Sequence, residues 1–144
     1  MKILMVCLGN ICRSPLADAI LNSITSDKII ADSAGTSNYH INSLPDPRMI
    51  KKGKEHGFDL TNLKARQFCQ EDFENFDLIL TMDKYNFKNI TNKTDNLEHL
   101  KKVELFLSNK EDVPDPYFGG EDGFELVFQI VHNECQRIAN KLDV

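Results

Sequence analysis

The chain has 144 residues, of which 41% are hydrophobic and 27% are charged, as is ordinary for a soluble globular protein. This length suits one well-packed domain and is too short for two, so we predict a single domain spanning residues 1–144. With 22 acidic and 17 basic residues the formal charge is −5, which argues against a nucleic-acid partner, because nucleic-acid binding needs a concentrated basic face.

The amino-terminal apolar run is too short for a secretion signal and lacks a cleavage site of small residues. No other stretch approaches the roughly 20 apolar residues that a membrane span needs. We therefore expect a cytoplasmic protein without a membrane span. In that reducing compartment the four cysteines are expected to be free thiols, with Cys69 and Cys135 in the core.

Residues 2–6 form an almost entirely apolar run of β-forming residues, which is typical of a strand buried on both faces of a parallel sheet. A loop and a helix follow. Ser14 is predicted to be the helix N-cap with Pro15 at the first helical position, and apolar residues recur at helical spacing as far as Ile24. Strand, tight loop and helix are the opening of a βαβ unit.

Further strands and helices alternate along the rest of the chain. Strands are predicted at residues 29–31, 77–81 and 102–107. Helices are predicted at residues 47–56, 70–76, 83–90 and 123–141, the first capped by Asp46. This order predicts an α/β fold: a central four-stranded parallel sheet with helices on both faces, and ligands bound at the carboxyl ends of the strands. Residues 38–47 and 111–120 are long loops, which are often functional.

The octapeptide from Cys7 to Ser14, CLGNICRS, joins the first strand to the first helix. Gly9 has no side chain to block an approaching ligand, and Asn10 tolerates a left-handed backbone, so successive amides can point inward as a nest. The helix behind the loop adds partial positive charge at its amino end. Such a loop is a phosphate cradle.

Cys7, at the base of this cradle, faces amides, a helix end and Arg13, all of which favour a thiolate, the nucleophilic form of cysteine. The planar guanidinium of Arg13 can hold two phosphate oxygens during transfer, and Ser14 can donate a hydrogen bond to the sulfur. The alternative is a core cysteine followed by a surface arginine, but the surrounding residues favour the phosphate loop. Cys7 and Cys12 alone are a poor metal site, so no metal or other cofactor is expected.

A proton donor for the leaving group is predicted at Asp115. General acids are typically worth about 10²–10⁴ in rate. The prolines on both sides of Asp115 stiffen its backbone, and the ring of Tyr117 can flank an aromatic leaving group. The alternative interpretation of this segment is an ordinary Asp-Pro turn.

Several motifs together identify a family. They are CLGNICRSP at residues 7–15, DSAGTSNYH at 32–40, PDPR at 45–48, KARQ at 64–67, MD at 82–83 and DPY at 115–117. Through them the chain resembles the low-molecular-weight protein tyrosine phosphatases over essentially its whole length.

The resemblance implies Cys7 as the nucleophile, Arg13 as the phosphate clamp and Asp115 as the general acid in both steps of a reaction through phosphocysteine, without a metal. It implies Tyr39 and Tyr117 as walls of a cleft for phosphotyrosine-containing proteins, and a monomer or weak dimer is expected. The resemblance also implies that His40 stands at the rim of that cleft. Phosphate binding and support of the loop are assigned to Leu8, Gly9, Asn10, Ile11, Cys12, Ser14 and Ser33.

Family knowledge also gives Cys12 a role, as the partner of Cys7 in a reversible, protective disulfide. One residue departs from the family pattern. A histidine that helps to brace the loop asparagine often precedes the KARQ segment, and here that position is Leu63. Ser33 is then the expected support for Asn10.

Two branches of the same fold are alternatives. Protein arginine phosphatases typically carry threonine at the position of Ile11, which here offers an apolar wall suited to an aryl leaving group. Thioredoxin-linked arsenate reductases need two further cysteines close together, whereas Cys69 and Cys135 are far apart in the chain. A non-enzymatic phosphate-binding module is disfavoured because a nucleophile and an acid are both present.

Overall fold

The computed structural model describes residues 1–117 and 119–143 of the chain. Four parallel strands form one sheet in the spatial order β2-β1-β3-β4. They are β1 (Lys2–Cys7), β2 (Ile30–Gly35), β3 (Leu78–Thr81) and β4 (Val103–Leu105). The predicted α/β fold with a four-stranded parallel sheet is therefore confirmed.

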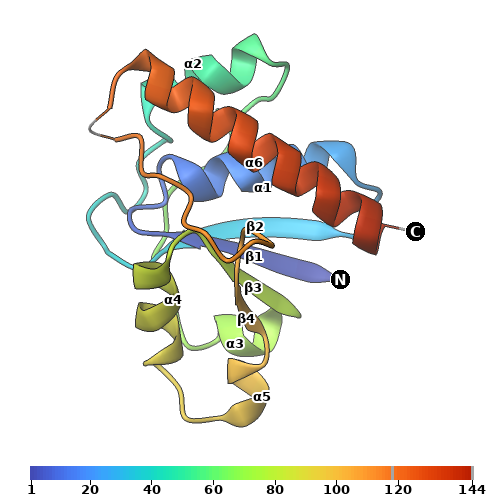
Figure 1. The fold of residues 1–144 in the computed structure, drawn as a ribbon. Coiled ribbons are helices and arrows are strands. Elements are labelled where there is room, and N and C mark those ends of the chain that lie inside the picture. The colour runs from blue at the N-terminus through green and yellow to red at the C-terminus, as the bar shows by residue number, and fades with distance from the viewer. Residues whose placement is uncertain (118, 144) are drawn as a thin grey trace.

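Helices cover both faces of this sheet, as predicted (Figure 1). One face carries α1, α2 and α6, and the other carries α3, α4 and α5. Their bounds are α1 (Arg13–Ile24), α2 (Pro47–Glu55), α3 (Asp72–Asn75), α4 (Lys84–Thr91), α5 (Leu97–Leu100) and α6 (Glu121–Leu142).

The composition of β1 follows from its position between these two layers. Ile3 and Met5 belong to the apolar cluster shared with α1 and α6, whereas Leu4 and Val6 belong to the cluster on the opposite face. All four side chains are fully buried. A central strand buried on both faces has no polar side to present, which explains its uninterrupted apolar sequence.

The predicted and observed elements differ mainly at their ends. The strand predicted at residues 102–107 is limited to β4, and α5 was not predicted because four residues are too few to show a helical period. The amino end of α5 nevertheless has a capping residue, because the Asn96 side chain accepts hydrogen bonds from the backbone amides of Glu98 and His99. Asp46 caps α2 with Pro47 at its first position, as predicted.

The carboxyl ends of the parallel strands meet at one edge of the sheet, where the loops that follow them converge (Figure 1). The close approach of two of these loops requires glycine at the end of β2. A Cβ atom on Gly35 would lie 2.8 Å from the carbonyl oxygen of Leu8. None of the described helices has the length and apolar content that a membrane crossing demands.

Candidate active site

The loop between β1 and α1 is held against the chain that leaves β2. The backbone amides of Thr36 and Ser37 donate to the carbonyls of Cys7 and Leu8, each at 2.9 Å. Asn10 has a φ of 57°, the left-handed conformation predicted for it. The loop therefore turns back on itself at the carboxyl edge of the sheet.

Ser14 lies inside this turn, and its hydroxyl is 2.9 Å from both Cys7 Sγ and Asn10 Oδ1. The prediction that Ser14 is the N-cap of α1 is wrong, because its hydroxyl contacts the loop and α1 begins at Arg13, two residues before the predicted start at Pro15. No side chain in the described part of the chain caps α1. The positive end of the helix thus faces the loop beside the buried Cys7 sulfur.

Arg13 projects from the first turn of α1 and is only 3% exposed. Its Nη1 donates to Asp83 Oδ2 at 2.8 Å and to the carbonyl of Val113 at 2.9 Å, while Nη2 lies 3.6 Å from Asp115 Oδ2. Burial works against the charge of this guanidinium, but the neighbouring Cys7, Asp83 and Asp115 outweigh it and raise the pKa of Arg13. Arg13 is a fixed cation at the base of the site.

Asp115 reaches the same place from the loop between β4 and α6. Its Oδ1 accepts a hydrogen bond from the backbone amide of Tyr117 at 3.0 Å, and its Oδ2 faces Arg13. The carboxylate is partly exposed, so it has access both to the pocket and to water. This placement suits a group that exchanges protons with a leaving group and with solvent.

These groups surround one pocket of about 170 Å³. Tyr39 and Tyr117 stand on its walls, and the rings of His40 and Tyr117 lie 6.2 Å apart between centroids. The predicted nucleophile, clamp, acid and cleft residues thus come together from three separate segments of the chain. The lining consists of Cys7, Leu8, Gly9, Ile11, Cys12, Arg13, Tyr39, His40, Asp115 and Tyr117.

Three of the residues assigned to the loop and its support, Asn10, Ser14 and Ser33, do not line this pocket. The buried amide nitrogen of Asn10 has no hydrogen-bond partner among the described residues. The Ser33 side chain lies near Asp18, and it makes no hydrogen bond to the amide nitrogen of Asn10. Leu63 packs against the apolar cluster on the α1 face, and thus offers Asn10 no polar contact.

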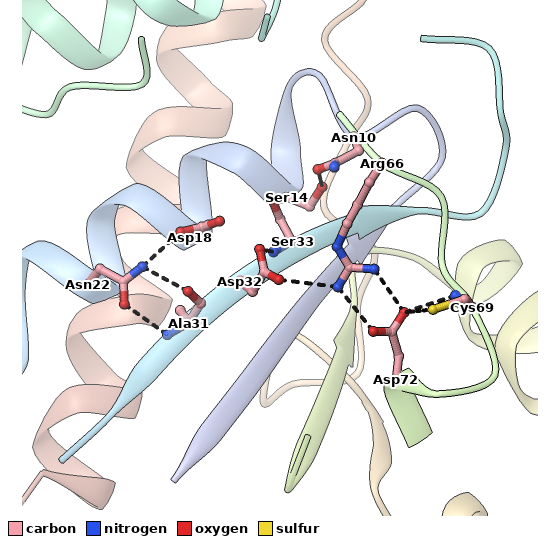
Figure 2. A network of polar contacts seen from close by, with 10 residues as sticks. All are labelled: Asn10, Ser14, Asp18, Asn22, Ala31, Asp32, Ser33, Arg66, Cys69 and Asp72. Carbon is pink, nitrogen blue, oxygen red and sulfur yellow. Dashed lines mark hydrogen bonds and ion pairs between the residues drawn. The ribbon is translucent and has the colours of Figure 1, made fainter. Parts of the chain in front are cut away.

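A network of polar side chains continues below the loop (Figure 2). The Asn22 side chain joins Asp18 to both backbone groups of Ala31 on the edge strand β2. Arg66 pairs with Asp32 at 3.2 Å and Asp72 at 3.0 Å, which ties the KARQ segment to the sheet and to α3.

Asp18 is the unusual member of this network because it is a carboxylic acid that is only 3% exposed. Burial, followed by the charge of Asp32, raises the pKa of Asp18 from its usual 3.8 to about 7. Hydrogen bonds from Ser33 and Asn22 oppose this rise only in part. Asp18 therefore changes its protonation state close to neutral pH.

The raised pKa of Asp18 predicts a stability effect of defined sign. Between about pH 4 and pH 7 the folded chain holds a proton that the unfolded chain has lost, so the stability falls as the pH rises through this interval. Asp18→Asn removes the effect. Its free energy of unfolding, relative to that of the wild type, should rise by up to about 4 kcal/mol between pH 4 and pH 7 and then level off. Urea unfolding at several pH values measures this difference.

Asp27→Asn, at an exposed position, is the matched control and should show a constant difference from the wild type. A constant difference for Asp18→Asn as well would contradict the assignment of a proton to buried Asp18.

The four cysteines, all within the described residues, are free. Burial, with the nearby charges of Asp46 and Cys7, raises the pKa of the Cys12 thiol. Cys135 is fully buried on α6, as expected, whereas Cys69 is exposed and the prediction that it belongs to the core is wrong. Cys69 lies at the turn before α3, where its amide donates to Asp72 at 2.9 Å.

Among residues 1–117 and 119–143, no cluster of three or more His, Cys, Asp or Glu side chains is placed to hold a metal ion.

Asp46 and Arg48 were missed as neighbours of the site. Asp46 was expected only to cap α2, yet its backbone amide also donates to the carbonyl of Ile11 in the loop at 2.8 Å. Arg48 reaches the loop that carries Asp115, through the carbonyl of Tyr117 at 2.7 Å. The only sequence signal was their place in the PDPR motif.

A buried thiol in the loop between a parallel strand and a helix, with an arginine and a carboxylate beside it, is the arrangement of a cysteine-dependent phosphatase. The family model described as low molecular weight phosphotyrosine protein phosphatase matches residues 2–144. The chain belongs to this family.

Individual relatives agree with this assignment. The human low molecular weight phosphotyrosine protein phosphatase is 38% identical, over 97% of this chain and 94% of its own. A protein tyrosine phosphatase from Entamoeba histolytica superposes with a TM-score of 0.89 at 38% identity, covering 99% of this chain and 96% of that one. A Drosophila arginine phosphatase superposes with a TM-score of 0.90 at 29% identity, covering 100% and 99%.

Proposed function

We propose that this protein hydrolyses phosphotyrosine in other proteins, and aryl phosphate monoesters generally, through a phosphorylated Cys7. The observation that carries the proposal is the convergence of Cys7, Arg13 and Asp115 on one pocket with tyrosines on its walls. Membership of the phosphotyrosine phosphatase family supports it.

In the first step the Cys7 thiolate attacks phosphorus, and the bond from phosphorus to the tyrosyl oxygen breaks. Asp115 donates its proton to that oxygen, so that tyrosine leaves as a neutral phenol. Arg13 holds the oxygens of the phosphoryl group as their charge redistributes, and the positive end of α1 assists it. The anchors of Arg13 on Asp83 and Val113 fix the orientation of the guanidinium before substrate arrives.

In the second step water attacks the phosphorus of phosphocysteine. The Asp115 carboxylate takes a proton from this water, the bond between sulfur and phosphorus breaks, and inorganic phosphate is released. Cys7 departs as a thiolate. The Ser14 hydroxyl, 2.9 Å away, can stabilise it by turning its single hydrogen from Asn10 Oδ1 to the sulfur. Asp115 ends the cycle protonated, as it began.

The pocket walls favour an aryl leaving group over a phosphorylated arginine. Ile11 lines the pocket with an apolar side chain, and Tyr39 and Tyr117 offer ring faces to a flat aromatic substrate. The similarity to an arginine phosphatase keeps that activity as the second candidate, because both enzymes share this fold.

Arsenate reduction through a thiol relay is less well supported. Such a relay requires resolving cysteines that can reach the nucleophile, but Cys135 is fully buried on α6 and Cys69 lies beside Asp72 before α3.

The proposed enzyme works without cofactors and uses a reduced Cys7, which favours the cytoplasm as its compartment.

The proposal predicts a ranking of substrates. For peptides of identical sequence, kcat/KM for phosphotyrosine should exceed that for phosphoserine and phosphoarginine by at least roughly 100-fold, because only phosphotyrosine offers a ring to the pocket walls. Steady-state phosphate release measures all three side by side. Ile11→Thr should narrow the gap between phosphotyrosine and phosphoarginine, whereas a preference of the wild type for phosphoarginine would overturn the assignment.

A further inference from the structure

Asp46 and Arg48, at the start of α2, form a charged pair beside the pocket. The Asp46 carboxylate is 7% exposed and accepts hydrogen bonds from Nε and Nη2 of Arg48 at 3.0 and 2.8 Å. These bonds lower the pKa of Asp46 and raise that of Arg48, so both side chains keep their charges. Through its backbone amide Asp46 also holds Ile11 of the phosphate loop at 2.8 Å. The pair is therefore fixed to the phosphate loop.

The same guanidinium extends to the loop that carries Asp115. Nη2 of Arg48 donates to the carbonyl of Tyr117 at 2.7 Å, and Nη1 lies 3.5 Å from the carbonyl of Gly119. Its central carbon lies 5.5 Å from the ring centre of Tyr117 and 4.6 Å from that of Phe124 on α6. Arg48 thus connects α2, the acid loop and α6.

Tyr117 is the residue through which this connection reaches the carboxylate of Asp115. Its amide donates to Asp115 Oδ1 at 3.0 Å, while its carbonyl accepts from Arg48. A shift of the Tyr117 backbone would move the carboxylate relative to Arg13 and Cys7. A displacement of about 1 Å in a catalytic group can cost 10²-fold in rate.

We propose that Arg48 is a positioning residue for the general acid, which holds the backbone of the Asp115 loop at a fixed distance from the phosphate loop. This inference rests on the proposed role of Asp115. Arg48 does not touch the substrate in this account. It acts through Tyr117. Replacing Arg48 should therefore lower the rate in the same way as a weaker general acid would, and should leave phosphate binding intact.

The test compares leaving groups in a double-mutant cycle. Arg48→Met keeps an unbranched side chain close in length to the aliphatic stem of arginine but removes the guanidinium, and with it every side-chain hydrogen bond of Arg48. We expect kcat/KM for phenyl phosphate, a poor leaving group, to fall about tenfold, and kcat/KM for 2,4-dinitrophenyl phosphate to stay within about twofold. In an Asp115→Asn background the same change should add no loss that depends on the leaving group.

Two further variants protect this test against a fold defect. Arg48→Lys keeps the charge without the planar fork and should show the same selective loss at smaller size. Arg137→Met, a similarly exposed arginine paired with Glu134 on α6, should match the wild type on both substrates. The inhibition constant for inorganic phosphate should be unchanged in all three single arginine variants.

The outcomes separate the two proposals. The role of Arg48 would be overturned if its variants lost activity equally on both substrates or were inhibited less strongly by phosphate. It would also be overturned if the selective loss persisted in the Asp115→Asn background. If Asp115→Asn itself shows equal losses on both substrates, the acid assignment falls and the inference about Arg48 falls with it.

Discussion

Asp115→Asn is expected to lower kcat/KM for phenyl phosphate by about 10²–10⁴, because the leaving phenolate then departs without a proton. Asparagine preserves the shape of the side chain and can still accept the hydrogen bond from the Tyr117 amide, so the loop should keep its conformation. For 2,4-dinitrophenyl phosphate, whose phenolate is a stable anion, the loss should be at least tenfold smaller than for phenyl phosphate. Steady-state kinetics on a series of phenols measures this dependence.

Asp112→Asn is the matched control for this experiment. Asp112 belongs to the same loop and is similarly exposed, but its carboxylate accepts from the backbone of Lys84 and does not line the pocket. It should retain activity on every substrate within about twofold, as surface substitutions usually do. Uniform losses across the series for Asp115→Asn would remove Asp115 from the role of acid.

The main features of the fold were predictable because local sequence dictates them. The uninterrupted apolar sequence of β1 requires a strand that is buried on both faces. The phosphate loop, Arg13 and α1 then follow directly in the chain. Asp46 capped α2 as predicted because a cap uses the backbone of its own helix. The pocket residues were also found in advance, since most of them stand in short motifs at the ends of strands.

Contacts between distant segments were not predictable in the same way. The carbonyls of Val113 and Tyr117, which orient Arg13 and Arg48, carry no sequence signal because every residue has a carbonyl group. Ser14 was assigned to a helix cap because its local sequence suits one. Its hydroxyl instead contacts two buried polar atoms, Cys7 Sγ and Asn10 Oδ1.

The support of the phosphate loop differs from the expectation for similar reasons. Ser33 was expected to support Asn10, yet it lies beside Asp18, a buried acid that sequence analysis did not single out. Leu63 occupies the place where the family often has a histidine, and the amide nitrogen of Asn10 has no partner among the described residues. Among the described residues, no side chain replaces that histidine as a hydrogen-bond partner of this amide nitrogen.

Cys7→Ser should produce the largest loss of activity. Serine keeps a group that can bond to Ser14 across the same short distance, but its hydroxyl is a far weaker nucleophile than a thiolate. The rate of phosphate ester hydrolysis should fall on the order of 10⁴-fold or more, as is usual when a covalent nucleophile is removed. Binding of inorganic phosphate should persist, since the loop amides and Arg13 remain, and Cys69→Ser at an exposed site should match the wild type.

The central claim is that phosphate passes through a covalent bond to Cys7, and rapid acid quenching during turnover tests it most directly. Mass spectrometry of the digested wild-type enzyme should locate a phosphoryl group on Cys7, and the Cys7→Ser enzyme treated in the same way should carry none. Phosphate found on another residue, or hydrolysis by Cys7→Ser at the rate of the wild type, would contradict the phosphocysteine mechanism.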